Sequence, residues 1–382
     1  MTKIFNDHNV YVLGAGFSAA RGLPLTTNFL FALRDAHPWL VANGRTAEAA
    51  AIQNVLEFRL TSTSATYRIP IDLENIEELF SLASAAGDSL ARDIRIAIAA
   101  TLDFCSSTAA VPTTGFRMTL DGPNIPAFRQ GRRESSVPGA SADHRVPTYD
   151  FVVAGLLGLL GEPRETATNT FVSFNYDLLV EEALSALTIP FSYGLGTERA
   201  RHDPSASCLT LSDSPHVLLL KLHGSTNWSL SAGSEDQLTV YGDYEDVQRS
   251  GHTPELIPPT WRKSYSPPLA AVWNHALDEF KKATRIVIIG FSIPPTDLHF
   301  KYLLAAGLRE NISLREIVFV NHNKTSIEQR AADLFGDLRR RPSVRVAESK
   351  AAQFVGQGMS DTTTWSIGRP IHIAIQSVVH PF

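Results

Sequence analysis

Five short hydrophobic runs constrain the fold of this 382-residue chain more than any other feature of its sequence. Each run is mostly apolar, is rich in β-branched residues and ends in small or polar residues. Continuous rather than alternating hydrophobicity is typical of strands covered on both faces, as in parallel sheets. Helical patterns lie between several runs, which predicts an open α/β sheet. The runs are NVYVLGAG from Asn9, TFVSFNYD from Thr170, HVLLLKLHG from His216, RIVIIGFS from Arg285 and EIVFVNHN from Glu316.

The long stretch between the first two runs does not follow this alternation. It contains helical segments such as ENIEELFSLASAAG, in which Asn75 and Glu78 have capping-box spacing, and TYDFVVAGLLGLLG from Thr148. We therefore predict an α/β fold, with a Rossmann-like, mainly parallel sheet interrupted by a helical insertion, or cap domain. The predicted parts are the sheet domain at residues 1–29 and 165–345 with an irregular excursion at 191–264, the insertion at 30–164 with a flexible loop at 112–147, and a C-terminal extension at 346–382.

Composition excludes several classes of protein. The formal net charge of −5 and the pI of about 6.2 give no basic field of the kind that binds nucleic acid. No apolar run is long enough for a membrane span, and the N-terminus lacks the order of a signal peptide. The only cysteines, Cys105 and Cys208, cannot supply a four-cysteine zinc site. We expect a cytoplasmic protein without bound metal, nucleic acid or membrane.

A glycine pattern directly follows the first run. Gly14 and Gly16, with Ala19 in the third small position, have the spacing of a dinucleotide-binding turn, which needs close backbone approach to a pyrophosphate. The acidic residue that usually binds the ribose would be Asp35, but Asp35 lies within a helical pattern. The motif therefore departs from the ordinary dehydrogenase arrangement, and a tight strand-to-helix turn without a ligand remains an alternative.

Polar residues end the other four runs. Asn175 and Asp177 end the second run, His223 the third, Ser292 the fourth and Asn321 the fifth. Ligands of open parallel sheets bind outside the carboxyl ends of the strands, so the glycine loop and these residues point to one crevice. Each residue taken alone could be a helix cap or a turn former, and His223 could be a histidine hydrogen-bonded at a turn. Their common position favours a site.

These motifs resemble those of sirtuins, in family order and over residues 9 to 325. GAGFSAARGLP is similar to the glycine-rich loop, SFNYD to the (T/Q)N(Y/V)D element, KLHGS to the catalytic (E/K)LHG element, GFSIPPTD to the later serine loop and VFVN to the strand that meets the adenosine ribose. The resemblance implies an NAD site with Asn175 and His223 as catalytic residues. It implies cofactor contacts by Gly14, Ala15, Gly16, Phe17, Ser18, Pro24, Asp177, Gly290, Phe291, Ser292 and Asn321.

The chain departs from the protein deacylases among sirtuins. The four cysteines of their zinc ribbon are missing, and Leu25-Thr26-Thr27 replaces their Asp-Phe-Arg. IPPTWRKS, at residues 257–264, and ENIEELFSL resemble instead a bacterial sirtuin-like branch in antiphage defence. That resemblance implies an NAD+ hydrolase that depletes the nucleotide pool, acting as a homo-oligomer with a separately encoded partner such as a HerA-type ATPase.

The implied chemistry assigns different tasks to the two catalytic candidates. Asn175 would orient the ribose or a water, and His223, with an unperturbed pKa near 6.5, would accept a proton while Gly224 lets the backbone turn away. Three alternatives stay open. The protein could be a deacylase or ADP-ribosyltransferase, or a nucleotide-sensing module without catalysis. A zinc hydrolase is disfavoured because His216 and His223 should face opposite sides of one strand.

Overall fold

A seven-stranded sheet forms the centre of the computed structural model, which describes residues 7–63, 69–120, 145–159, 167–231, 233–261, 263–293, 298–335, 343–360 and 373–377. The strand order is β12-β11-β10-β1-β4-β7-β5, and every neighbouring pair is parallel. This confirms the predicted α/β class, and each of the five hydrophobic runs supplies one strand. The strands are β1 (His8–Leu13), β4 (Thr168–Ser173), β5 (Phe191–Ser192), β7 (Val217–Lys221), β10 (Arg285–Ile289), β11 (Glu316–Asn321) and β12 (Ser343–Glu348).

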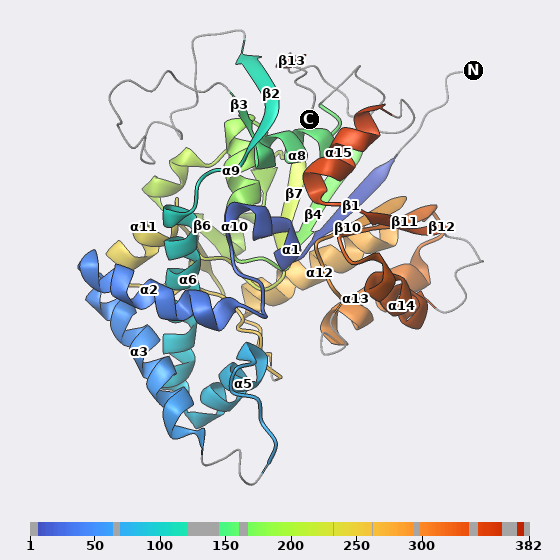
Figure 1. Cartoon of the computed structure of the whole chain (residues 1–382). Coiled ribbons are helices and arrows are strands. Elements are labelled where there is room, and N and C mark those ends of the chain that lie inside the picture. The colour runs from blue at the N-terminus through green and yellow to red at the C-terminus, as the bar shows by residue number, and fades with distance from the viewer. Residues whose placement is uncertain are drawn as a thin grey trace, which may run out of the picture.

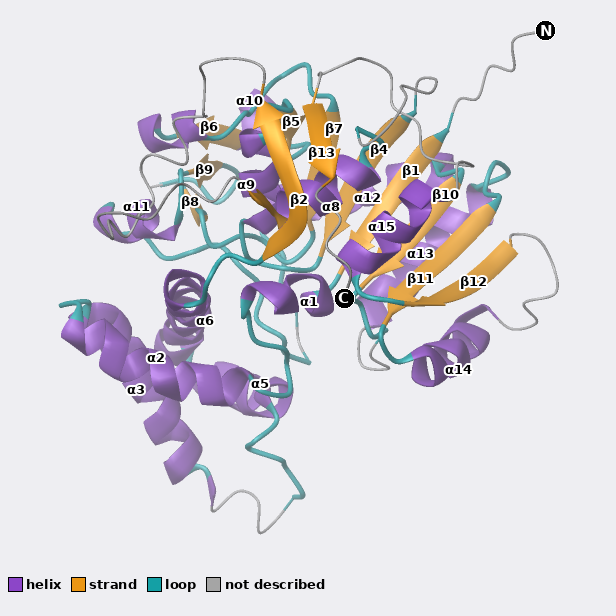
Figure 2. Cartoon of the chain, turned by 45° about the horizontal axis from the view of Figure 1, so that its top comes forward, coloured by secondary structure: helices purple, strands orange, loops and turns teal. Residues whose placement is uncertain are grey.

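The strand register aligns the carboxyl ends of four central strands, β10, β1, β4 and β7. Leu13 at the end of β1 pairs with both Ser173 of β4 and Ile289 of β10, and Ser173 pairs in turn with Lys221 of β7. The chain segments that follow these strands therefore emerge side by side along one edge of the sheet, where α1 (Ala15–Ser18) lies (Figure 2).

Helices cover both faces of the sheet, which explains why its central strands are mostly apolar. On one face the buried Tyr11 of β1 donates its hydroxyl hydrogen to the carbonyl oxygen of Leu156 in α8. On the other face Thr170 of β4 donates to Glu279 of α12 at 2.7 Å. Helix α8 packs against α9 and α15, and α12 packs against α13 (Figure 1). The bounds are α8 (Thr148–Leu156), α9 (Leu179–Ala186), α12 (Pro267–Lys282), α13 (Leu298–Glu310), α14 (Lys324–Phe335) and α15 (Ala351–Ser360).

Among the described residues, four helices form the insertion, which projects from the carboxyl edge of the sheet (Figure 1). They are α2 (Phe29–Ala42), α3 (Thr46–Thr61), α5 (Ile76–Ala86) and α6 (Asp88–Thr108). Asn75 caps α5 as its spacing predicts, accepting a hydrogen bond from the backbone N–H of Glu77. The reciprocal bond of a capping box is displaced, because Glu78 accepts from the backbone N–H of Asp72 instead.

Several helices and strands lie across the domain limits that the sequence predicted. Helix α8 falls within the predicted insertion but packs on the sheet. The ends of the predicted loop 112–147 are strands, β2 (Thr113–Leu120) and β3 (Arg145–Pro147), and β2 pairs with β13 (Ile373–Ser377) from the predicted C-terminal extension. Residues 121–144 of that loop lie outside the described residues. The predicted limit at 345 falls inside β12, which joins the main sheet. Local composition could not reveal pairing partners so distant in the chain.

The excursion at 191–264 contains a second small sheet beside β5 and β7. Its strand order is β6-β9-β8, with β6 (Ala200–His202) parallel to β9 (Leu238–Val240) and β8 (Trp228–Leu230) antiparallel to it. Two short helices, α10 (Gly196–Arg199) and α11 (Tyr244–Arg249), accompany it. Among the residues that the structure describes, no helix is both long and apolar enough to cross a membrane.

Candidate active site

The two predicted catalytic residues occupy equivalent places on neighbouring strands. Asn175 and His223 each lie two residues beyond the paired ends of β4 and β7, at Ser173 and Lys221. Both side chains are buried, with exposed fractions of 9% and 8%. The tertiary structure thus brings the SFNYD and KLHGS segments to one edge, although the strands themselves end two residues earlier than the sequence patterns suggest.

The glycines of the first loop are required by a close crossing of two chain segments. The backbone N–H of Gly14 donates to the carbonyl of Ile289 at 3.0 Å, and that of Gly16 donates to the carbonyl of Gly290 at 2.8 Å. A Cβ atom on Gly14 would lie 2.6 Å from the Cα of Phe291, and one on Gly16 would lie 2.8 Å from the oxygen of Gly290. Close packing against the end of β10 therefore accounts for both glycines.

This crossing also limits the donors that the loop can offer to a phosphate. Besides Gly14 and Gly16, the backbone N–H of Phe17 is engaged, donating to the carbonyl of Gly14 at 2.8 Å. Three of the five N–H groups between Gly14 and Ser18 thus already have protein partners. Contact between this loop and a pyrophosphate stays a prediction, and it would depend on the remaining groups.

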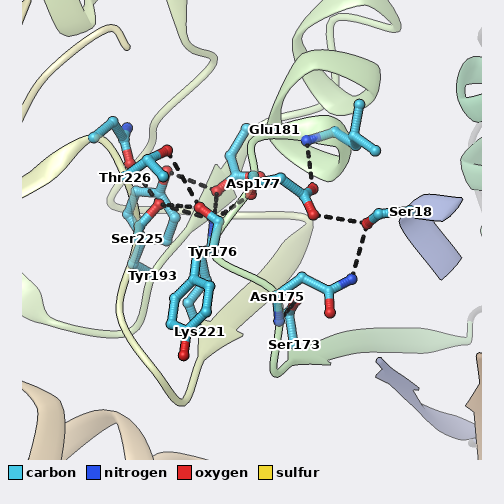
Figure 3. A network of polar contacts seen from close by, with 12 residues as sticks. Ser18, Ser173, Asn175, Tyr176, Asp177, Glu181, Tyr193, Lys221, Ser225 and Thr226 are labelled. Carbon is cyan, nitrogen blue, oxygen red and sulfur yellow. Dashed lines mark hydrogen bonds and ion pairs between the residues drawn. The ribbon is translucent and has the colours of Figure 1, made fainter. Parts of the chain in front are cut away.

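Asn175 joins the glycine loop to the loop after β4. Its side-chain nitrogen Nδ2 donates to the carbonyl of Gly14 at 3.0 Å and to Oγ of Ser18 at 2.9 Å. Ser18 in turn donates to Oδ2 of Asp177 at 2.7 Å, and Oδ1 of Asp177 accepts from the backbone N–H of Leu179 at the start of α9 (Figure 3). Both amide hydrogens of Asn175 are engaged, so Oδ1 is the atom with which it can contact a substrate.

Aromatic side chains surround His223. The ring of Phe174 meets it edge to face at 5.1 Å between centroids, and the rings of Tyr176 and Trp273 lie at 6.3 Å. Trp273 of α12 also donates its indole N–H to the carbonyl of Leu222 at 2.8 Å, which fixes the backbone beside the histidine. The site therefore has an apolar floor that excludes water from most of the imidazole.

Burial and a neighbouring cation change the acid–base character of His223. Its pKa is well below the ordinary value, first because burial disfavours the charged ring, and then because Lys263 and His299 are close. The Nζ atom of Lys263 lies 3.2 Å from Nε2 of the ring. The expectation of an unperturbed pKa was wrong for this reason. His223 is neutral at neutral pH, which is the form that can accept a proton.

Gly224 has the role that its place after the histidine predicts. Its φ of +80° lies in the left-handed region, and a Cβ atom there would overlap the carbonyl oxygen of Glu255. A non-glycine residue would force apart the turn and the segment that crosses it.

The remaining predicted contacts are placed along the same edge but take separate roles. Phe291 stacks on Phe174 with ring centroids 4.7 Å apart, so it belongs to the apolar floor. The exposed Ser292 accepts a hydrogen bond from Arg330 through its carbonyl. Asn321 accepts from the backbone N–H of Asn323 at 3.0 Å and so closes a local turn. None of these observations assigns a ligand to them.

Pro24 lies in a cavity separate from the site around Asn175 and His223. It lines an open cavity of about 340 Å³ between α2 and the end of α6, together with Asp35 and Cys105. Asp35 is inside α2, as its helical pattern predicts, and burial raises the pKa of the Cys105 thiol to about 11, so that this cysteine is not a reactive thiolate.

Sequence reasoning missed a buried ion pair beneath the site. Lys221 of β7 and Glu181 of α9 are each 1% exposed, with Nζ 2.8 Å from Oε1. The same Nζ donates to the carbonyl oxygens of Tyr176 and Asp177 at 3.3 and 2.5 Å, and to Oγ of Ser225 at 2.8 Å (Figure 3). Lys221 therefore holds the loop that carries Asn175. A lysine within an otherwise apolar strand was the available signal.

Comparison with known proteins finds a family that resembles the part of the chain around this site. Residues 169–335 match the family model of the SIR2-like domain, and the matched stretch includes Asn175 and His223. No curated protein matches the chain.

Solved Sir2 structures resemble the chain at low identity. A Sir2 complex with a p53 peptide and NAD+ has 12% identity and a TM-score of 0.39, covering 92% of each chain. A mutant Sir2 homologue with ADP-ribose has 12% identity and a TM-score of 0.37, covering 93% of this chain and 91% of that chain.

Proposed function

We propose that this protein is an NAD+ glycohydrolase, which cleaves the bond between nicotinamide and ribose to give nicotinamide and ADP-ribose. The observation that carries the proposal is the placement of a buried, neutral histidine and a buried asparagine at the level ends of two adjacent parallel strands, within the stretch that matches the SIR2-like domain. A site that only binds a nucleotide has no need of a buried proton acceptor.

Hydrolysis requires water to add at C1′ of the ribose as nicotinamide leaves as a neutral pyridine. The carbon develops oxocarbenium character, and the proton lost by water must pass to a base. His223 can take that proton because it is uncharged, and general-base help of this kind contributes roughly 10²–10⁴-fold to the rate. Oδ1 of Asn175 can accept a hydrogen bond from a ribose hydroxyl or from the attacking water.

The apolar floor has a role in the same step. Phe174 and Trp273 lie beside the imidazole, Phe291 stacks on Phe174, and together they keep bulk water away from the ring. In such an environment the departing pyridine is well accommodated, because it is neutral and planar once the bond has broken. The oxocarbenium-like sugar is then exposed only to the water that Asn175 and His223 orient.

The test is product analysis with purified protein and NAD+, without an acylated peptide. We expect nicotinamide and ADP-ribose, and we expect His223→Ala to lower turnover about 10²-fold or more. His216→Ala is the matched control, because His216 is exposed and precedes the opposite end of the same strand. Nicotinamide release that depends strictly on an acyl-lysine peptide would show a deacylase instead.

The proposal extends to the biological setting implied by the motifs. We propose that the protein acts in the cytoplasm as the NAD-depleting effector of a bacterial antiphage defence system. An unregulated NAD+ hydrolase would kill its host, so we propose a homo-oligomer held in check until a separately encoded partner, such as a HerA-type ATPase, engages the helical insertion. Light scattering and turnover measured with and without the partner test this. Full activity of an isolated monomer would refute it.

A further inference from the structure

A segment from the excursion crosses directly over the candidate site. It comprises residues 255–266, of which residue 262 lies outside the described part of the chain, and we call it the crossing segment. The backbone N–H of Ile257 donates to the carbonyl of His223 at 2.8 Å, and the hydroxyl of Tyr176 donates to the carbonyl of Ile257 at 2.6 Å. The carbonyl of Glu255 accepts from the backbone N–H of Ser225 at 3.1 Å. The crossing segment is thus hydrogen-bonded to the loop after β4 and to the loop after β7.

The helical insertion holds the same segment at two points. Arg95 of α6 forms an ion pair with the buried carboxylate of Glu255, at 3.2 Å between Nη1 and Oε2. The backbone N–H of Trp261 donates to Oγ of Ser81 in α5 at 2.9 Å. The crossing segment is therefore a physical connection between the insertion and the histidine.

Lys263 is the residue of this segment that reaches the imidazole. An ammonium group has three hydrogens to donate and no lone pair, so at 3.2 Å it is the donor and Nε2 of His223 is the acceptor. A neutral imidazole carries one N–H, and the contact therefore places that hydrogen on Nδ1. Lys263 selects a tautomer as well as adding a positive charge beside the ring.

His299 also lowers the pKa of His223 through its charge, but Lys263 is the group in hydrogen-bond contact with the ring. Among the described residues, the titratable groups that face His223 are Lys263 of the crossing segment, His299 of α13 and Tyr176 of the loop after β4. The rings of Phe174 and Trp273 complete the surroundings and carry no charge. Of these groups, Lys263 lies within hydrogen-bond distance of a ring nitrogen, at 3.2 Å between Nζ and Nε2.

We propose that Lys263 is a positioning residue that holds His223 as the uncharged Nδ1–H tautomer, and that the helical insertion sets the place of Lys263 through the crossing segment. The catalytic consequence rests on the proposed function. The lone pair of Nε2 that accepts from Lys263 is also the one that must accept a proton from water. Lys263 therefore has to leave Nε2 during turnover, and the insertion is placed to control that movement.

The experiment uses three substitutions of Lys263 that separate charge from hydrogen bonding. Lys263→Arg keeps both, Lys263→Gln keeps a donor without the charge, and Lys263→Met keeps neither. Lys324→Met is the control, since Lys324 is half exposed and its ion pair with Glu328 lies on α14. Ring nitrogens of ¹⁵N-labelled histidine are followed by NMR from about pH 5 to about pH 8, with His223→Ala identifying the signals of His223.

In the parent and in Lys263→Arg we expect an unprotonated Nε2 that resists protonation as the pH falls. In Lys263→Gln the His223 ring should keep its tautomer but become protonated at a higher pH than in the parent. In Lys263→Met the ring should also become protonated at a higher pH, and it should lose its tautomer preference. Identical His223 signals and titration in the parent and Lys263→Met would overturn the proposal. These measurements need no substrate, so they decide the role of Lys263 even if the protein proves not to cleave NAD+.

Kinetics supply the second readout. If the protein cleaves NAD+, kcat/KM of Lys263→Met should fall about tenfold below that of the parent at acidic pH, because more of its His223 is protonated. At neutral and higher pH, kcat/KM of Lys263→Met should remain within about threefold of the parent value, since Lys263 does not take part in the bond cleavage. A loss of about 100-fold at every pH would contradict the proposal and would make Lys263 a catalytic residue.

Discussion

Lys221→Met is the substitution that most directly tests how the site is supported. Lys221 and Glu181 are both 1% exposed, and Nζ lies within hydrogen-bond distance of a carboxylate, two carbonyls and a hydroxyl. Methionine fills a similar volume but leaves the Glu181 carboxylate buried without its cation. Removing one partner of a buried ion pair costs about 3–5 kcal/mol. With a urea m value near 3 kcal/mol/M, the unfolding midpoint should fall by roughly 1–1.7 M.

The loss should depend on pH in a defined direction. Burial raises the pKa of Glu181, and Lys221 opposes that rise. In Lys221→Met the folded-state pKa of Glu181 rises further above that of the unfolded chain, about 4.3. The folded protein then retains a proton that the unfolded chain releases, so stability falls as pH rises through the interval between the two pKa values. The difference from the parent should be smaller near pH 5 than near pH 8.

Two further variants test whether the unpaired buried charge causes the loss of stability. Glu181→Gln in the Lys221→Met background removes the unpaired charge, so it should recover part of the stability and abolish the additional pH dependence. Lys324→Met breaks an exposed ion pair with Glu328 and should cost less than about 1 kcal/mol. A loss below about 1 kcal/mol in Lys221→Met, or one that does not change between the two pH values, would show that the buried charge is not what stabilises this loop.

Three other predictions concern Gly224, Asn175 and the removal of metal ions. Gly224→Ala should destabilise the protein far more than Gly44→Ala in thermal melts, because both glycines have positive φ but only a Cβ on Gly224 would overlap neighbouring backbone; equal losses would point to φ strain alone. Asn175→Ala should lower the free energy of unfolding by about 1–3 kcal/mol as well as turnover, since it removes two buried hydrogen bonds, and an unchanged urea midpoint would contradict that account. Treatment with a chelator should leave the melting temperature unchanged, as the two cysteines of the chain cannot form a four-cysteine zinc site; one tightly bound zinc per chain by elemental analysis would refute this.

The sequence predicted the strands and the edge on which the site lies because both depend on local pattern. A strand covered on both faces must be mostly apolar, and β1, β4, β7, β10 and β11 each correspond to one such run. Parallel strands in turn place their carboxyl ends on one edge, which is why Asn175 and His223 were expected to converge.

Domain limits were less predictable, since they depend on contacts made after the chain has folded. Helix α8 has the same local pattern as the helices of the insertion, but Tyr11 and the sheet hold it. Strand β2 was taken for part of a loop because its partner β13 lies more than 250 residues further along the chain. Neither position could be read from composition, which describes only neighbouring residues.

The residue types at the strand ends follow from the amino-acid sequence alone, whereas their chemical state depends on how the chain folds around them. The ordinary pKa expected for His223 assumed a solvated ring, whereas burial beneath Phe174 and the approach of Lys263, 40 residues away, keep the ring neutral. Gly14 and Gly16 were read as a phosphate-binding turn, and the fold adds that the end of β10 requires them. Burial and charge proximity arise from segments distant in sequence, so they exist only once the sheet has assembled.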